Sequence, residues 1–211
     1  MGDKLVVLLS GGIDSVVAAY MMAKKGSEII LVYGFNEPYT DARNKERALK
    51  CTELLSRILK KKIKIYVLLH GTNLQEFIRK CPSRLTCVLC KRMLLRSAER
   101  IAKEEGAKAI VTGENVAQVA SQTLQNLVVL NQAVKTPILR PLVALDKQQI
   151  VDLAKEVGIY ETSILPADAC RAVPPKPATS AKLEDVLRAE ENLDITGLMK
   201  GMLHGKEVLH I

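Results

Sequence analysis

The residues best suited to chemistry form one short segment near the start of the chain, Ser10-Gly11-Gly12-Ile13-Asp14-Ser15. Two adjacent glycines let the backbone approach a ligand and direct successive N–H groups at it, and Ser10 and Ser15 add hydroxyl donors. A helix that starts here contributes unpaired amides and the positive end of its dipole. The segment therefore predicts an anion-binding loop. Asp14 would repel phosphate unless Mg²⁺ lay between them, so we expect ATP bound with Mg²⁺.

This loop differs from two common phosphate-binding motifs. No lysine follows the glycines as in GxxxxGK[ST], and the spacing is not that of GxGxxG. The simpler alternative is a Gly-Gly turn in which Asp14 only caps a helix. The strand pattern before the loop and the helix pattern after it favour nucleotide binding over that alternative.

Three of the five cysteines are spaced for metal or sulfur chemistry. Cys87 and Cys90 form a CxxC motif, and Cys170 lies 80 residues further on, in a proline-rich stretch. Three thiolates suit an iron–sulfur cluster with one free iron, or zinc with a water as fourth ligand. A persulfide on Cys170 that Cys87 or Cys90 resolves is a third interpretation, and three free core thiols are a fourth. Cys51 is expected in the core, and Cys81 is a weaker candidate for a fourth ligand.

Alternating strand and helix patterns predict how these residues are positioned. Apolar runs typical of strands buried on both faces occur at residues 4–9, 28–33, 63–69, 108–112 and 137–142. Helical patterns cover residues 15–25, 41–60, 91–105, 147–157 and 181–192. The alternation predicts an α/β fold, a doubly wound parallel sheet of about five strands. The first loop would then lie at the carboxyl ends of the strands, where such sheets bind ligands.

The chain is expected to form one unit. Residues 1–182 would make up the α/β domain, and residues 183–211 a C-terminal helix and tail of the same unit. Residues 196–211 have no clear pattern. Residues 166–177 hold four of the eight prolines, which predicts a loop that carries Cys170.

Composition limits the partners. Lys and Arg number 31 against 23 Asp and Glu, and the resulting charge of +8 suits a polyanion such as ATP or RNA, although a lysine-rich solvated surface explains it as well. Aromatic residues are only 3%, so an aromatic platform for stacking bases is not expected. Apolar runs are too short to span a bilayer, and no signal-peptide pattern opens the chain. We therefore expect a cytoplasmic protein without membrane contact.

Further segments resemble a known family. They follow the glycine loop in order, between residues 4 and 182, and comprise Cys90-Lys91-Arg92-Met93, Thr112-Gly113-Glu114-Asn115, Gln118 to Leu127, and Leu139-Arg140-Pro141-Leu142. Together they resemble the catalytic domain of the tRNA 4-thiouridine synthetases, the tRNA sulfurtransferases of thiamine-biosynthesis type. The loop itself looks like the PP-loop of the ATP pyrophosphatases, whose fold is adenine nucleotide α-hydrolase-like. In that family the loop grips the pyrophosphate leaving group.

The resemblance implies roles by position. ATP would be bound by the loop and by residues at strand ends: Leu8, Leu9, Ser10, Gly11, Gly12, Asp14, Ser15, Tyr33, Gly34, Lys91, Gly113 and Gln122. Asp14 and Lys91 would act in catalysis, and Cys170 would handle sulfur. Cys87, Cys90 and Cys170 would hold an iron–sulfur cluster, as in members that lack a rhodanese-type domain.

The expected activity is ATP-dependent tRNA thiolation. A uracil carbonyl oxygen of tRNA attacks the α-phosphorus of ATP and releases pyrophosphate, and a sulfur nucleophile then displaces AMP. The first alternative is sulfur transfer to a small-molecule thiamine thiazole precursor. An amidoligase that uses ammonia would not need three cysteines. A non-catalytic nucleotide or metal sensor is the alternative from a different class.

Expected partners follow from the same resemblance. No THUMP-type RNA-binding domain is expected before residue 4 and no rhodanese domain after residue 211. We therefore expect weak tRNA binding by this chain alone, a separate RNA-binding protein and a sulfur donor, and leave a homodimer open. Candidate phosphate contacts are Lys60, Lys61, Lys62, Arg79, Arg84 and Arg92. The histidines His70, His204 and His210 are expected at the surface or in the tail.

Overall fold

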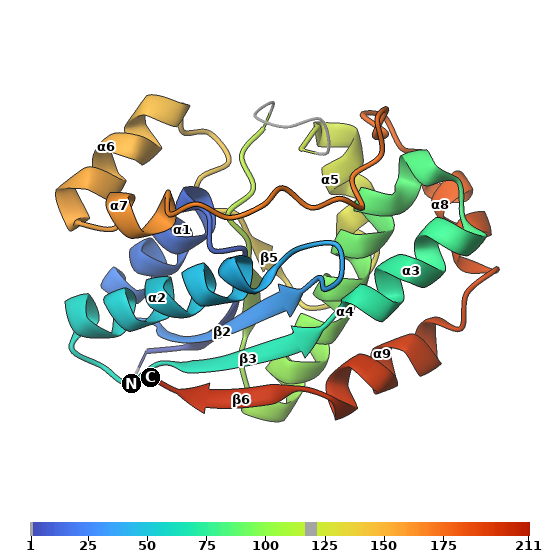
Figure 1. The fold of residues 1–211 in the computed structure, drawn as a ribbon. Helices are drawn as coiled ribbons and strands as arrows, with labels where there is room; N and C mark the ends of the chain where they lie inside the picture. Colours follow the sequence, from blue (N-terminus) through green and yellow to red (C-terminus); the bar gives the residue numbers. More distant parts are fainter. Residues whose placement is uncertain (1, 117–121) are drawn as a thin grey trace.

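The centre of the molecule is a six-stranded sheet of order β5-β4-β1-β2-β3-β6 (Figure 1). The computed structural model describes residues 2–116 and 122–211. The strands are β1 (Lys4–Leu9), β2 (Glu28–Phe35), β3 (Lys64–Leu69), β4 (Ala109–Val111), β5 (Ile138–Leu139) and β6 (Glu207–His210). Strands β1 to β5 are parallel, and β6 runs antiparallel to β3. The doubly wound α/β fold is confirmed, with one strand more than expected because the tail forms β6.

Helices cover both faces of this sheet (Figure 1). One face carries α1 (Ile13–Lys24), α2 (Ala42–Leu59), α6 (Lys147–Val157) and α7 (Tyr160–Ser163). The other carries α3 (Gly71–Lys80), α4 (Thr86–Glu105), α5 (Leu124–Asn131), α8 (Leu183–Glu190) and α9 (Ile195–His204), with the short 3-10 turn Ser83–Leu85 before α4. Among the described residues, no helix is both long and apolar enough to cross a bilayer.

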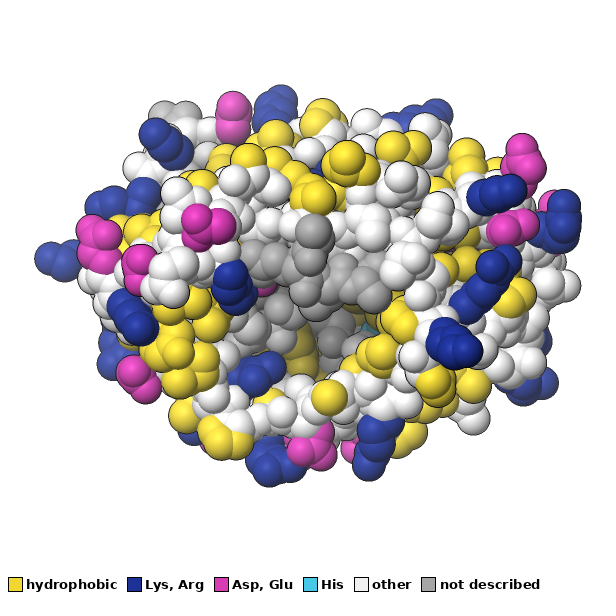
Figure 2. Space-filling model, turned by 90° about the horizontal axis from the view of Figure 1, so that it is seen from above, with side chains coloured by type: hydrophobic (Ala, Val, Ile, Leu, Met, Phe, Trp, Pro, Cys, Tyr) yellow, Lys and Arg dark blue, Asp and Glu magenta, His cyan; other side chains and the backbone are white. Residues whose placement is uncertain are grey.

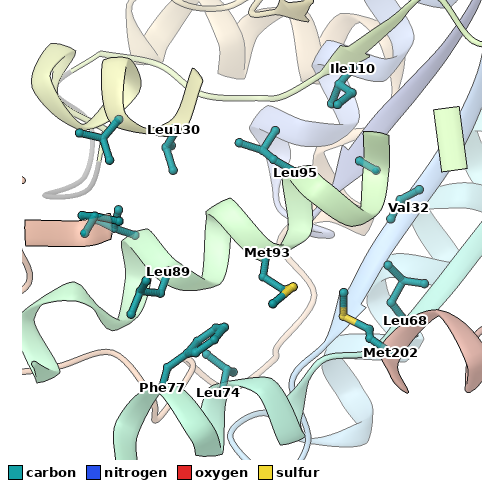
Figure 3. Packing of buried hydrophobic residues seen from close by; sticks show 14 of the residues in the cluster. Val32, Leu68, Leu74, Phe77, Leu89, Met93, Leu95, Ile110, Leu130 and Met202 are labelled. Atoms are coloured by element: carbon teal, nitrogen blue, oxygen red, sulfur yellow. The ribbon is translucent and has the colours of Figure 1, made fainter. Parts of the chain in front are cut away.

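The helix α4 occupies the middle of its face. Its buried side chains Leu89, Met93 and Leu95 lie between the sheet and the surrounding helices (Figure 3). On the sheet side they meet residues such as Val32, and on the outer side Phe77 of α3. Because every residue of α4 from position 86 to 99 is buried or half-buried, the first turns of this helix are held firmly relative to the strand ends.

Capping residues explain where several helices begin and end. Asp146 accepts a hydrogen bond from the Gln149 amide in a capping box at the start of α6, and Gly158 ends that helix with φ of +79°. The expected start of a helix at residue 91 is wrong, since this helix, α4, begins at Thr86. The CxxC motif is therefore part of the first two turns of α4 and does not precede it.

The strand order reverses between β1 and β4. The chain passes from β1 through β2 to β3, and returns to the other side of β1 with β4 and β5. β1 and β4 are neighbours, but the loop after β1 leads to one face of the sheet and the loop after β4 leads to the other. A crevice therefore opens between the two loops, at the carboxyl ends of the strands. These loops are residues 10–12 and 112–114, which include much of the predicted site.

Candidate active site

The glycine loop leaves the first amides of α1 open. Gly12 is the N-cap of that helix, and no side chain caps it, so the N–H groups of residues 13–15 are available to an anion. Ser15 Oγ donates to the Gly12 carbonyl at 3.0 Å and lies 3.0 Å from Ser10 Oγ. Gly11 has φ of +76°, and a Cβ there would lie 3.3 Å from Ala48 Cα. The loop is therefore an anion cradle that its own serines hold in shape.

The loop after β4 closes against this cradle. A Cβ on Gly113 would lie 2.6 Å from the Ser15 backbone nitrogen, so only glycine permits the contact. A cavity of about 210 Å³ lies at the junction. It is lined by Leu8, Leu9, Ser10, Asp14, Ser15, Val32, Gly34, Lys91, Leu94, Leu95, Thr112, Gly113, Glu114, Gln122 and Leu130.

Most residues that were expected to bind ATP therefore meet at one cavity. Gly11 and Gly12 belong to the adjoining loop. Tyr33 is not among the lining residues, because side chains alternate along β2 and its ring faces the α2 side, where it stacks on Phe35 with ring centroids 6.5 Å apart. The segment Gln118–Ser121 of the family-like motif lies outside the described residues.

A buried carboxylate holds Lys91 in place. Glu114 accepts hydrogen bonds from Lys91 Nζ at 3.1 Å, from Arg140 Nε at 2.9 Å and from the Thr112 hydroxyl at 3.1 Å. Burial alone would raise the pKa of Glu114, but the charges of Lys91 and Arg140 outweigh it and hold that pKa below its usual value. The cluster carries two cations and one anion, so it presents net positive charge at the cavity.

Lys147 is a site residue that sequence reasoning missed. This first residue of α6 forms an ion pair with Asp14 of the glycine loop. The Asp14 side chain is 25% exposed, so both groups remain accessible to a ligand. The sequence signal was limited to Asp146, which marks the start of α6. Only the packing of α6 on α1 brings the next residue to the loop.

The three predicted site cysteines lie near one another. Cys87 and Cys90 come from the first turns of α4, and Cys170 from the loop before α8, where Asn36 Nδ2 donates to its Sγ at 3.8 Å. Burial raises the pKa of Cys87 and of Cys90, and the charges of neighbouring site cysteines raise both further. The three thiols are thus within electrostatic reach of each other. None of them is in a disulfide.

The other two cysteines stand apart from this group. Cys51 is fully buried, and burial raises its pKa to about 11, as suits a core thiol. Cys81 Sγ donates to the Ala189 carbonyl at 3.4 Å. Among the described residues, no three His, Cys, Asp or Glu side chains are already arranged around a common point as metal ligands.

Two expectations about basic residues are wrong. Arg92 is 1% exposed and donates to Glu190 at 2.8 Å, so it cannot contact a phosphate backbone; it points inward because α4 is covered by α8. His70 is not a surface residue, since it is fully buried with its Nε2 3.2 Å from Cys90 Sγ. It follows β3 directly and faces the first turns of α4.

A larger cavity of about 590 Å³ lies at the opposite, amino-terminal edge of the strands. Lys24, Lys61 and Lys62 contribute to its lining. The glycine loop, Lys91 and the cysteines are all at the other edge, so the smaller cavity is the candidate site.

A family model described as Thiamine biosynthesis protein (ThiI) matches residues 1–195. The chain belongs to the ThiI family. The match covers the glycine loop, the cavity and all three site cysteines, and so confirms the resemblance inferred from the separate motifs.

Curated relatives are similar over nearly the whole chain. A probable tRNA sulfurtransferase of Caldanaerobacter subterraneus is 47% identical over 194 residues, covering 90% of this chain and 50% of that protein. One from Methanosarcina mazei is 41% identical and covers 99% of this chain and 52% of that protein. The chain therefore spans about half the length of the curated relatives it matches.

Solved structures agree with the ThiI assignment. A 4-thiouridine synthetase, crystallised as an RNA complex with bound ATP, matches with a TM-score of 0.95 and 34% identity over 99% of this chain and 55% of that one. The NMN synthetase from Francisella tularensis matches with a TM-score of 0.62 at 18% identity over 96% of this chain and 85% of that one, which shows a shared fold alone.

Proposed function

We propose that this ThiI-family chain carries out the ATP-dependent thiolation of a uracil in tRNA, which forms 4-thiouridine in the cytoplasm. The position of Lys91 carries the proposal. Its ammonium lies at the nucleotide cavity, 3.1 Å from Glu114, while its charge acts on the thiols of Cys87 and Cys90. Lys91 and the two thiols lie within about one turn of α4. This turn would therefore connect the cavity, where ATP would activate the uracil oxygen, with the thiols that would deliver sulfur. The ATP-bound 4-thiouridine synthetase of the same fold supports this function.

The first step is adenylation. The uracil carbonyl oxygen forms a bond to the α-phosphorus of ATP, and the bond from that phosphorus to the bridging oxygen breaks, which releases pyrophosphate. The open amides at the start of α1 would hold the departing phosphates, and Lys91 would offset their charge. Asp14 would hold Mg²⁺, an ion that supplies further neutralisation of phosphate charge.

The second step is sulfur transfer. Adenylation has turned the carbonyl oxygen into a leaving group, so a sulfur nucleophile can bond to the ring carbon while the carbon–oxygen bond breaks and AMP departs. Cys170 is the thiol we place nearest this step, on the loop that faces Asn36 at the end of β2. The sulfur itself comes from a separate donor.

We further propose that Cys87, Cys90 and Cys170 hold an iron–sulfur cluster. The donor set fits by its chemistry, since thiolates are the usual ligands of such clusters and these three thiols already lie close together. Their side chains must still turn toward a common point. A bound cluster with three protein ligands supplies an open iron that can bind sulfide.

The adenylation step is tested by product analysis. With tRNA present, ATP should yield AMP and pyrophosphate and no orthophosphate. Asp14→Ala and Lys147→Met should each lower turnover at least tenfold, because both remove a charge from the phosphate site. Lys155→Met removes a lysine of α6 that faces Tyr160 and should leave turnover unchanged. Orthophosphate as the product, or full activity in Asp14→Ala, would end this proposal.

The sulfur site is tested by iron and sulfide content after anaerobic reconstitution. Alanine at Cys87, Cys90 or Cys170 should remove the cluster and the thiolation activity together. Cys51→Ala should remove neither, because that thiol packs behind the glycine loop. Protein that takes up only zinc, or no metal, would favour a persulfide carried on Cys170.

A second candidate is sulfur transfer to a thiamine thiazole precursor, which the description of the matching family model favours. It uses the same ATP and sulfur sites and differs only in the acceptor. Pyrophosphate release that depends on the thiazole precursor and not on tRNA would place this candidate first.

A further inference from the structure

His70 places a hydrogen-bonding ring nitrogen on one of the three site thiols. It directly follows β3 and is fully buried, and its Nε2 lies 3.2 Å from Cys90 Sγ. The ring also packs edge-on against Phe77, with ring centroids 6.1 Å apart. The two reaction steps proposed above leave this histidine without a part.

Asn73 determines which nitrogen of His70 carries the proton. Asn73 Nδ2 lies 3.2 Å from His70 Nδ1 and 3.3 Å from Met202 Sδ. An amide NH₂ group only donates and a thioether sulfur only accepts, so Nδ1 of the histidine must accept. The proton is therefore on Nε2 and points at Cys90.

The strength of the hydrogen bond from His70 Nε2–H depends on the charge of the Cys90 sulfur that it faces. A neutral thiol sulfur is only a weak acceptor, so the contact to the free Cys90 thiol is weak. A sulfur that carries negative charge, as an iron ligand or as a persulfide, gains roughly twice the hydrogen-bond strength. The N–H is already fixed in direction, so no rearrangement is needed when that charge forms.

We propose that His70 is a positioning residue for sulfur chemistry at Cys90, whose Nε2–H stabilises negatively charged sulfur there while Asn73 holds the required tautomer. The inference rests on the proposed function only in that Cys90 must carry charged sulfur. Loss of such a partner typically lowers metal affinity about 10–100-fold. We therefore expect a marked effect on sulfur and iron retention.

Two substitutions separate hydrogen bonding from packing. His70→Gln keeps an amide N–H near the position of Nε2, whereas His70→Leu fills similar space without a donor. His204→Leu, at an exposed histidine of α9, is the matched control. After anaerobic reconstitution, iron release to a chelator and the visible spectrum are measured, with ATP binding as the check on folding. If His70→Leu loses ATP binding, Asn73→Leu replaces it, since that variant leaves the ring in place.

We expect about tenfold faster iron release in His70→Leu, near-normal release in His70→Gln and no change in the control. Equal release from His70→Leu and the wild type, or equal loss in both His70 variants, would overturn the inference. If the wild type takes up no iron, the cluster is refuted and the inference is tested on persulfide. Polysulfide is then loaded onto protein that also carries Cys87→Ala and Cys170→Ala, so that the persulfide at Cys90 is measured. Cyanide-labile sulfur should fall when His70→Leu is added, and an unchanged content would overturn the inference.

Discussion

At the scale of single residues, the charge balance around Glu114 determines how much positive charge Lys91 presents at the cavity. A lone Lys91–Glu114 pair would be neutral and would attract phosphate weakly. Arg140 supplies a second cation, 2.9 Å from the same carboxylate, so the buried cluster keeps a net positive charge. Among the described residues, Arg140 Nη2 is buried without a hydrogen-bond partner, so no further acceptor offsets the charge of this guanidinium there.

We therefore predict that Arg140→Met weakens ATP binding although Arg140 is not among the residues that line the cavity. Loss of one cation near the phosphates should cost about 1–2 kcal/mol, or roughly tenfold in Kd, measured by calorimetric titration. Arg100→Met removes the same charge at an exposed position of α4 and should leave Kd unchanged. Unchanged ATP affinity in a folded Arg140→Met protein would show that Glu114 does not neutralise Lys91.

The sequence predicted part of this site. Loop residues such as Asp14 are adjacent in the chain, so their spacing alone indicates their chemistry. Lys91 and Gly113 were found only through resemblance to a family. The pairings of Lys147 with Asp14 and of Arg140 with Glu114 join residues 133 and 26 positions apart. No local pattern encodes such pairs, because they depend on how α6 and β5 settle against their neighbours.

At the scale of elements, a buried ion network ties α8 to α4, the helix that carries the CxxC motif. Glu190 accepts two hydrogen bonds from Arg92 at 2.8 and 3.0 Å and two from Arg96 at 2.7 and 2.8 Å. Burial opposes the charge on Glu190, but the two arginines outweigh it and lower its pKa from 4.5 to about 2. The network therefore stabilises the fold and makes its stability depend on pH.

We predict that Glu190→Gln destabilises the protein by about 3–5 kcal/mol at pH 7, because it leaves Arg92 buried without its anion. The Glu190 carboxylate takes up a proton near pH 4.5 in the unfolded chain, where its pKa is 4.5. In the folded protein its pKa is about 2, so protonation occurs only near pH 2. The stabilisation is thus complete above pH 4.5 and is lost as the pH falls toward 2. Urea unfolding measures the free energy of unfolding of the wild type and of Glu190→Gln. The difference between these two free energies should be about 2 kcal/mol smaller at pH 3 than at pH 7.

Glu104→Gln is the control for this measurement, since Glu104 pairs with Arg100 at an exposed part of the same helix. The free energy of unfolding of Glu104→Gln should differ little from that of the wild type at both pH 7 and pH 3. A gap between wild type and Glu190→Gln that is the same at pH 7 and pH 3 would mean that Glu190 is not the titrating group.

Helices with strong end signals were predicted well, and weakly marked elements were not. α6 has Asp146 before it and Gly158 after it, and both bounds were correct. α3 starts at a glycine after the buried His70, which is no cap signal. α9 contains Gly197 and Gly201, both poor helix formers, and β6 has only four residues. These elements form because they cover α4 and the edge of β3, which is a tertiary effect.

At the scale of the whole molecule, the chain carries a net charge of +8, and the cations on the face in Figure 2 do not gather in one patch. Lysine and arginine side chains are spread around the face shown in Figure 2 and alternate with acidic and apolar groups. Of the predicted phosphate contacts, Arg79 and Arg84 pair with Glu76 and Asp185. The exposed Lys60, Lys61 and Lys62 lie at the edge of the sheet opposite the nucleotide cavity.

We therefore predict that this chain alone binds tRNA weakly, with a dissociation constant on the order of 10–100 μM at physiological salt. Contacts from dispersed cations to phosphates give affinity without sequence choice, and salt weakens them steeply. Efficient thiolation should then require RNA recognition from outside the residues of this chain, which presents one base to the cavity. The measurement is a tRNA titration at two salt concentrations, followed by thiolation assays with and without cell extract.

Charge reversal of Lys60, Lys61 and Lys62 to glutamate provides the internal comparison for this titration. These lysines lie far from the glycine loop, so the variant should weaken tRNA binding at low salt while ATP binding stays normal. Tight, salt-resistant binding that selects tRNA over other RNA would contradict the prediction, because it would require a recognition surface on this chain. Such a surface would have to include cations beyond Lys60, Lys61 and Lys62, since Arg92 is buried and Arg79 and Arg84 are already paired.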